Sequence, residues 1–252
     1  ILNVPEEERK KYDVSSIRKL LCSSAPARSE VKKGILRCFP NVELFEAYGS
    51  TEAGLVTLLR PEDQLRKLGS IGKECLGTDV IKLLDENGKE VSVGEVGELY
   101  SRGPMMFDEY YKLPEKTEAS FRGDLFTARD MAKQDEEGYY YLVDRKDNMI
   151  ITGGEHVYPS EVEEVISRHP KVFDVAVIGV PDDMWGEAVK AVVILKENQT
   201  AMPEEIIEWC RGKMAGYKKP KSVDFIPPHE MPRTTTGKIL HRKLRERYAQ
   251  PL

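Results

Sequence analysis

The sequence predicts a mixed fold, with α/β structure first, a small distorted β-barrel in the middle and α+β structure at the end. Three observations predict it: a strand–helix–strand pattern over residues 17–48, hairpin turns over residues 80–143, and alternating strands and helices after residue 148. With 252 residues, 40% of them hydrophobic, the chain can bury more than one core. We therefore expect three parts, residues 1–66, 67–146 and 147–252.

The first part has the pattern of a parallel sheet. Residues 17–22 are typical of a strand, residues 28–38 of a helix, and residues 42–48 of a second strand. A parallel α/β sheet is buried on both faces and needs more strands than these. We therefore expect residues 1–66 to be the remnant of a larger α/β domain.

The middle part is punctuated by turns. A strand at 80–84 meets the turn DENG at 85–88, a strand at 98–102 follows a turn at 94–97, and a strand at 139–143 follows a turn at 135–138. Short strands closed by tight turns favour a small barrel.

The last part opens with a buried strand at 149–152, followed by Gly153 and Gly154, where the missing side chains allow close approach. Pro159 and Ser160 are expected to open a helix, and Ser160 and Glu163 have the spacing of a capping box. The remaining expected elements are strands at 172–180 and 188–195, a helix at 204–213, a strand at 222–226 and a final helix from about Lys238.

Composition excludes several classes of protein. The net charge is −5, and no apolar run approaches the roughly 18 residues that cross a bilayer, so we expect no transmembrane segment. The basic excess between Arg211 and Arg247 lacks interleaved aromatic residues, which argues against nucleic acid and suits the phosphates of a small ligand. Scattered cysteines without a CxxC pair indicate reduced thiols and a cytoplasmic protein: Cys22, Cys38, Cys75 and Cys210.

Two segments carry potential chemistry. The segment 48–54 (YGSTEAG) follows a strand, and ligands of open α/β sheets bind at strand ends. There Thr51 can bond a phosphate oxygen and Glu52 can hold Mg²⁺. The segment 232–240 (PRTTTGKIL) is a hydroxyl-rich loop that presents Lys238 before a helix, and it lacks the glycine spacing of a Walker A loop. Taken alone, a segment like 48–54 is more often a helix N-cap, and a lysine like Lys238 is more often a solvated lysine before a helix.

Together with the segment 144–165 (DRKDNMIITGGEHVYPSEVEEV), these motifs give a closer identification. In this order, over nearly the whole chain, they resemble the adenylate-forming superfamily of acyl-CoA synthetases, peptide-synthetase adenylation domains and beetle luciferases. The resemblance implies the carboxy-terminal portion of an acid–thiol ligase, which joins a carboxylic acid to ATP as acyl-AMP and transfers it to coenzyme A. We expect this chain alone, without the family's phosphate loop, to be inactive.

Two alternatives stay open: a ligase that loads a carrier protein, and a non-catalytic nucleotide- or CoA-binding module. The oligomeric state also stays open, and an oligomer is compatible with the sequence.

The resemblance also implies roles for individual residues. For adenylation it implies catalysis by Lys238, Thr51 and Glu52, with Glu52 holding Mg²⁺, and binding of ATP or AMP by Ser24, Ala25, Pro26, Tyr48, Gly49, Asp130 and Arg145. Tyr48 would stack on adenine and Asp130 would accept hydrogen bonds from the ribose. The chain departs from the family where serines 23 and 24 replace glycines, where Arg129 replaces the glycine before Asp130, and where His156 replaces an asparagine.

For the second substrate, the resemblance implies a tunnel for pantetheine and a basic turn for the CoA phosphates. These would be formed by Gly153, Gly154, Trp185, Tyr217, Lys219 and Lys221, with Asp147 as the hinge of the small domain. The segments 97–103 and 110–117 also match the family, and we expect a mainly architectural role for them.

Overall fold

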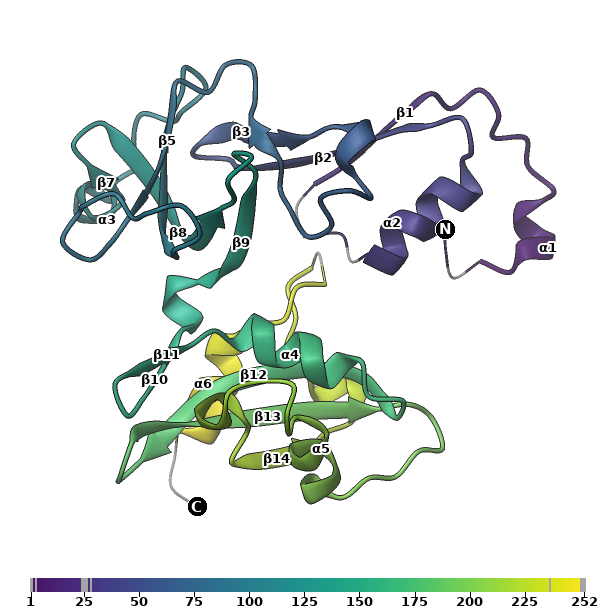
Figure 1. Ribbon diagram of the computed structural model, residues 1–252, viewed down its shortest axis with the longest axis vertical. Helices are drawn as coiled ribbons and strands as arrows, with labels where there is room; N and C mark the ends of the chain where they lie inside the picture. The colour runs from purple at the N-terminus through teal and green to yellow at the C-terminus, as the bar shows by residue number, and fades with distance from the viewer. Residues whose placement is uncertain (1, 3, 24–26, 28, 236, 250–252) are drawn as a thin grey trace. The chain divides into compact units, whose positions relative to one another are not determined.

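The computed structural model describes residues 2, 4–23, 27, 29–235 and 237–249 (Figure 1). The chain divides into two compact units, Ile1–Leu142 and Val143–Leu252. The predicted fold class, α/β followed by sheet-rich and α+β parts, is confirmed. The division at residues 66 and 146 stays a prediction.

The first unit begins with a sheet in the order β1-β2-β3-β4, of which β1 and β2 are parallel and the other pairs antiparallel. The predicted strand–helix–strand pattern is confirmed, and β3 is an additional strand. The elements are α1 (Glu6–Arg9), β1 (Lys19–Cys22), α2 (Ser29–Cys38), β2 (Glu43–Ser50), β3 (Gly54–Leu59), η1 (Pro61–Asp63) and β4 (Lys73–Glu74).

The second sheet of this unit has the order β5-β6-β8-β7, with β9 also paired to β8. In its core, which is mainly aliphatic, the ring of Phe126, a residue only 2% exposed, lies edge-on to the rings of Phe107 and Phe121 at centroid distances of 5.3 and 5.6 Å. The elements are β5 (Val80–Leu84), β6 (Gly97–Arg102), α3 (Pro114–Ala119), β7 (Phe121–Arg122), β8 (Leu125–Gln134) and β9 (Tyr140–Arg145).

The second unit is built on a sheet in the order β11-β10-β13-β12, and β14 pairs parallel to β13. The elements are η2 (Lys146–Asn148), β10 (Ile150–Thr152), β11 (Glu155–Val157), α4 (Pro159–Ser167), β12 (Val172–Asp182), β13 (Gly186–Leu195), α5 (Pro203–Trp209), η3 (Gly216–Lys218), β14 (Ser222–Phe225), η4 (Pro228–Glu230) and α6 (His241–Tyr248).

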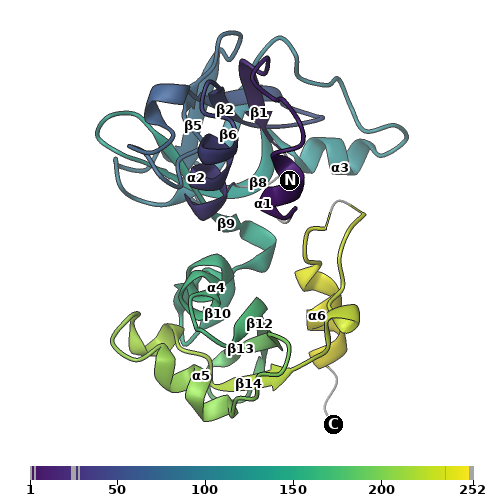
Figure 2. The same ribbon diagram turned by 90° about the vertical axis from the view of Figure 1, so that its right-hand side faces the viewer.

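The residues of β12 alternate between two cores. Val175 and Val177 pack with residues of α4 and α5, whereas Ala176 and Ile178 pack with Leu244 of α6. Figure 2 shows the result, with α4 and α5 on one face of the sheet and α6 on the other. A strand covered on both faces is apolar at successive positions, as this one is.

The helix α4 begins at Pro159, as expected, but its cap differs from the expectation. The capping box predicted for Ser160 and Glu163 is wrong, because Pro159 takes the first helical position and moves the cap to Tyr158. The Tyr158 amide donates to Oε1 of Glu161 at 3.3 Å, and the Ser160 amide donates to Asp144 Oδ2 at 2.8 Å. Glu163 is therefore available for contacts outside its own helix.

Candidate functional site

The segment 48–54 forms a tight hairpin between β2 and β3. A Cβ on Gly49 would lie 2.1 Å from the Gly54 carbonyl oxygen, so the two strands can close only over a glycine. Gly54 has φ +70° and lies so close to Met105 that its Cβ would be 2.7 Å from the Met105 Cβ. Thr51 and Glu52 lie at the tip of this hairpin, between the two strands.

The structure brings Tyr48 and Asp130 together across 82 positions of sequence. The Tyr48 hydroxyl donates to Asp130 Oδ2 at 2.7 Å, and both side chains are half-buried. A tyrosine ring beside a carboxylate offers a stacking surface next to a hydrogen-bond acceptor for hydroxyls. This pairing suits a base and its attached ribose.

A local bend presents Asp130. Arg129 has φ +64°, a left-handed conformation that favours glycine, and the register between β6 and β8 shifts at this point. The Arg129 amide donates to Thr127 Oγ1 at 2.8 Å, and the Thr127 hydroxyl donates to Glu98 at 3.0 Å. The conformation that glycine would adopt is therefore kept despite the substitution.

Glu52 is held by a residue that was expected to be mainly architectural. The Tyr110 hydroxyl donates to Glu52 Oε1 at 2.8 Å, and the Phe107 amide donates to the Glu52 carbonyl oxygen at 2.8 Å. The Lys116 ammonium lies 3.8 Å from the centre of the Tyr110 ring. Burial alone would raise the pKa of Glu52, but the hydrogen bond from Tyr110 and the charge of Lys116 lower it overall. Glu52 is ionised at neutral pH.

Ser24, Ala25 and Pro26 lie outside the described residues. Directly after them in sequence, the Ala27 amide donates to Glu46 Oε1 at 3.0 Å. Glu46 is itself paired with Lys32 of α2, and both side chains are at most 5% exposed. A buried ion pair of this kind fixes the Glu46 carboxylate that accepts the Ala27 amide, because breaking the pair would strand a buried charge.

In the second unit, Asp144 organises the segment that contains Arg145 and Asp147. Its Oδ1 accepts the Arg145 amide at 2.6 Å and the Asn148 side-chain amide at 3.1 Å. The Asp147 carbonyl oxygen accepts a hydrogen bond from the guanidinium of Arg245 in α6. The side chains of Arg145 and Asp147 are exposed.

The two glycines of the β10–β11 turn have different reasons to be glycine. Both have left-handed backbones, with φ +60° at Gly153 and +84° at Gly154. A Cβ on Gly153 would lie 2.6 Å from the Trp185 ring, whereas one on Gly154 would meet nothing within 4 Å. Trp185 is 46% exposed, so it is not a core residue.

Lys221 joins this group. Its ammonium lies 3.3 Å from Asp182 Oδ2 and 5.1 Å from the centre of the Trp185 ring. Asp182 also accepts the Trp185 amide at 2.9 Å. The other two predicted CoA residues, Tyr217 and Lys219, flank Lys218, which pairs with Glu161 of α4 at 2.7 Å.

Lys238 lies in a narrow hairpin that precedes α6, the yellow loop of Figure 2. The Thr234 amide donates to the Lys238 carbonyl oxygen at 2.8 Å, and the Lys238 amide donates to Thr234 Oγ1 at 3.1 Å. The Lys238 side chain is exposed. An exposed ammonium on a residue whose backbone N–H and C=O are both bonded to Thr234 can be presented to a charged ligand.

Tyr110 is the residue of the candidate site that the sequence did not reveal. It stands 58 positions from Glu52, and no local pattern joins the two. The available signal was that its segment, 110–117, matches the family without an assigned catalytic or binding role.

The described residues contain no group of three or more His, Cys, Asp or Glu side chains placed to hold a metal ion. A magnesium ion bound with ATP needs less than this, because it is held by one or two carboxylates together with the phosphates. Glu52, ionised and half-buried, fits that need. Within the same described residues, no helix has the length and apolar character to cross a membrane.

Comparison with protein families gives two matches in sequence order. Residues 1–111 match the AMP-binding enzyme family, and residues 161–238 match the AMP-binding enzyme C-terminal domain.

Curated relatives include a long-chain-fatty-acid–CoA ligase of Yersinia pestis, 38% identical over 95% of this chain and 42% of its own length. Another is a feruloyl-CoA synthase of an Amycolatopsis species, 40% identical over 94% of this chain and 47% of its own. The chain thus spans about half the length of the curated relatives it matches.

Several solved structures are also similar to this chain over most of its length. An ATP-bound RpMatB-BxBclM chimera matches 98% of this chain and 48% of its own, with a TM-score of 0.87 and 33% identity. The o-succinylbenzoate CoA synthetase MenE of Bacillus subtilis, in complex with the acyl-adenylate intermediate OSB-AMP, matches 94% and 48%, with a TM-score of 0.82 and 31% identity. The amide bond synthetase McbA of Marinactinospora thermotolerans matches 95% and 48%, with a TM-score of 0.84 and 30% identity.

Proposed function

Because this chain belongs to the adenylate-forming, AMP-binding enzyme superfamily, we propose that it is the carboxy-terminal part of an ATP-dependent acyl-CoA synthetase. The observation that most supports this proposal is the hydrogen bond of Tyr48 to Asp130. It joins the residue expected to stack on adenine to the residue expected to bind ribose.

In the proposed first half-reaction, a carboxylate oxygen attacks the α-phosphorus of ATP. The new bond is O–P, the bond to the β-phosphate oxygen breaks, and pyrophosphate leaves. Asp130 and Arg145 hold the ribose, Thr51 bonds a phosphate oxygen, and Lys238 offsets the charge that develops on the phosphoryl group. Mg²⁺ bound to ATP would supply further charge neutralisation, and Glu52 would hold it.

In the proposed second half-reaction, the sulfur of a deprotonated CoA thiol attacks the acyl carbon. A C–S bond forms, the C–O bond to AMP breaks, and AMP leaves with the electron pair. Gly153, Gly154 and Trp185 would line the path of the pantetheine arm, with the basic residues Lys219 and Lys221 and Tyr217 near the CoA phosphates. A rotation about Asp147 would exchange the Lys238 loop for this tunnel.

The acceptor distinguishes this proposal from its main alternative, a ligase that loads a carrier protein. The ammonium of Lys221, 5.1 Å from the centre of the Trp185 ring, would suit a phosphate of CoA better than a helical partner, and this supports CoA as the acceptor. The amide bond synthetase among the structural relatives makes an amine a further acceptor to include in the test.

The test is a screen for pyrophosphate release by the full-length enzyme with short, long, aromatic and dicarboxylic acids, followed by acceptor trials with CoA, a carrier protein and amines. We expect acid-dependent pyrophosphate release and a thioester with CoA. Binding of ATP without pyrophosphate release from any acid would instead support a non-catalytic module.

A further inference from the structure

The hairpin that carries Lys238 is closed by its own backbone. Besides the bonds between Thr234 and Lys238, the Leu240 amide donates to the Pro232 carbonyl oxygen at 2.9 Å. The position of the lysine backbone is therefore decided by whatever holds the two ends of this hairpin.

Arg233 holds the first end. Its guanidinium donates to the Gly237 carbonyl oxygen at 2.9 Å, across the turn, and to the Asp174 carboxylate of β12. Asp174 has a side chain only 17% exposed. One side chain thus closes the turn and fixes it to the sheet.

His241, the first residue of α6, holds the second end. Its Nε2 lies 2.7 Å from Oε1 of Glu163 in α4, and the same oxygen accepts the Val177 amide at 2.8 Å. Among the strands that the structure describes, β12 pairs only with β13, so Val177 is on an open edge whose amide needs an acceptor. Both ends of the hairpin are therefore attached to one short stretch of β12, Asp174 directly and Val177 through Glu163.

The groups that face His241 favour its cation. Burial alone would lower the pKa of His241, but the hydrogen bond and charge of Glu163 and the charge of Asp144 outweigh both burial and the opposing charge of Arg245, so the pKa lies above its ordinary value of 6.5. The side chains of His241 and Glu163 are 15% and 22% exposed, which shields the ion pair from solvent.

We propose that Arg233 and His241 are positioning residues that fix the Lys238 hairpin on β12, and that the contact of His241 with Glu163 requires a cation at position 241. The inference rests on the proposed function and deepens it. Lysine has a long flexible side chain, so the precision of its ammonium depends on a backbone that does not move.

The test compares His241→Asn with His241→Arg and with Arg242→Gln, a matched control whose side chain is 83% exposed. In the full-length enzyme, single-turnover rates are measured for adenylation and for thioester formation from supplied acyl-adenylate. We expect His241→Asn to slow adenylation by about 10–100-fold, as for a small misplacement of a catalytic group, and to leave thioester formation within about twofold. His241→Arg should restore adenylation because it supplies a permanent cation.

The pH profile adds a readout that a purely structural role would not move. In the unsubstituted enzyme, the adenylation rate should fall as pH rises through the raised pKa of His241, because the cation that bonds Glu163 is lost. The His241→Arg variant should lack this step in the pH profile, because its cation is permanent. Glu163→Gln, which keeps an acceptor for Val177 but removes the charge, should also abolish the step.

Three outcomes would overturn the inference: equal rates for His241→Asn and Arg242→Gln, equal losses in both half-reactions, or a pH step that persists in both His241→Arg and Glu163→Gln. Absence of acyl-adenylate with the unsubstituted enzyme and every acid would overturn the proposed function itself.

Discussion

Tyr110 and Tyr111 are adjacent tyrosines with different surroundings. The Tyr110 hydroxyl is bonded to Glu52, whereas Tyr111 is 81% exposed. A hydrogen bond to a charged group contributes about 1.5–3 kcal/mol, and the half-buried setting of Glu52 places this one near the lower end. The hydroxyl of Tyr110 therefore orients the carboxylate that would hold Mg²⁺.

We predict that Tyr110→Phe lowers kcat/KM for ATP about tenfold, whereas Tyr111→Phe leaves it unchanged. Steady-state kinetics of pyrophosphate release at varied MgATP measures both. Binding of Mn²⁺ with ATP, followed by electron paramagnetic resonance, should weaken in the Tyr110 variant alone. If the two variants have the same kcat/KM and the same Mn²⁺ binding, Tyr110 contributes only to packing and does not orient Glu52.

Gly153 and Gly154 form a second matched pair. Alanine at either position has to adopt a left-handed backbone, at about 1–2 kcal/mol, but only at Gly153 does it also displace the Trp185 ring. We predict that Gly153→Ala slows thioester formation about 10–100-fold more than Gly154→Ala, with adenylation equal in the two. Stopped-flow measurement of each half-reaction decides this, and equal thioester rates would refute the tunnel assignment.

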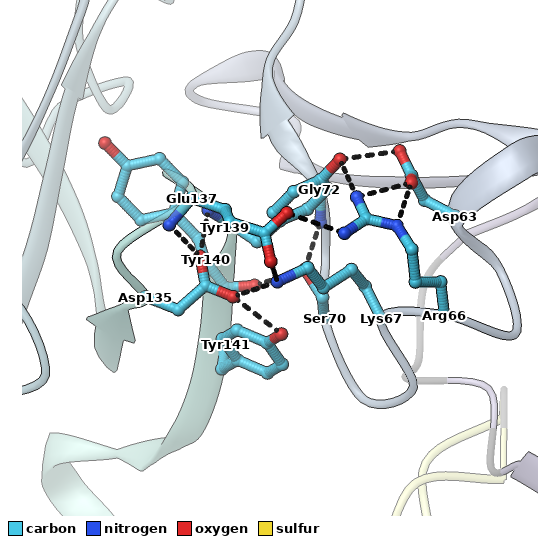
Figure 3. Close-up of polar contacts among 10 residues, drawn as sticks. All are labelled: Asp63, Arg66, Lys67, Ser70, Gly72, Asp135, Glu137, Tyr139, Tyr140 and Tyr141. Carbon is cyan, nitrogen blue, oxygen red and sulfur yellow. Dashed lines mark hydrogen bonds and ion pairs between the residues drawn. The ribbon is translucent and has the colours of Figure 1, made fainter.

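At the scale of elements, a network of ion pairs ties the segment after η1 to the turn between β8 and β9 (Figure 3). The Lys67 ammonium lies 2.7 Å from Asp135 Oδ2 and 2.5 Å from Glu137 Oε1. On the other side, Arg66 pairs with Asp63 at 2.8 Å, and Asp63 accepts the Tyr139 hydroxyl at 2.7 Å. These contacts join the two sheets of the first unit.

The network predicts acid sensitivity. Hydrogen bonds from Lys67 and Arg66 lower the pKa of Glu137, and although burial alone would raise those of Asp63 and Asp135, hydrogen bonds from Tyr139 and Lys67 lower them below 3.8. A carboxyl group whose pKa is lower in the folded than in the unfolded protein stabilises the fold at pH values above its unfolded-state pKa. This stabilisation is lost as the pH falls through its folded-state pKa.

The ordinary pKa of glutamate is 4.5. The thermal unfolding midpoint of the first unit should therefore fall as the pH falls from about 4.5 through the lowered pKa values of these carboxyl groups. Lys67→Met should lower the midpoint at pH 7 and flatten this dependence, whereas Lys89→Met, at an exposed turn, should do neither. A Lys67→Met profile that parallels the unsubstituted one would contradict the network's role.

The sequence anticipated elements better than contacts. Strands bounded by glycine-rich turns, such as β5 and β6, are encoded locally and were predicted close to their bounds. The helix α4 begins at Pro159 as predicted, but the predicted cap is wrong because a proline at the first helical position outweighs a capping pattern. The contact of Glu52 with Tyr110 joins residues 58 positions apart, and that of His241 with Glu163 joins residues 78 positions apart. The local pattern of apolar residues does not indicate which residues so far apart in sequence meet in the fold.

At the scale of the whole molecule, the hinge assignment of Asp147 is a prediction about domain motion. Proline at this position fixes its own φ near −65° and disfavours the helical conformation of Lys146, which lies in η2. We predict that Asp147→Pro slows one half-reaction much more than the other. If single-turnover rates of both half-reactions fall equally, or if neither falls, the assignment of Asp147 as the hinge is wrong.

The central claim is that Lys238 acts on the phosphoryl transition state of adenylation only, and Lys238→Ala in the full-length enzyme tests it most directly. Removal of one preorganised charge should slow single-turnover adenylation by about 10²–10³-fold, or roughly 2.7–4 kcal/mol. Thioester formation from supplied acyl-adenylate should be nearly unchanged. Equal loss in both half-reactions, or undiminished adenylation, would contradict the claim.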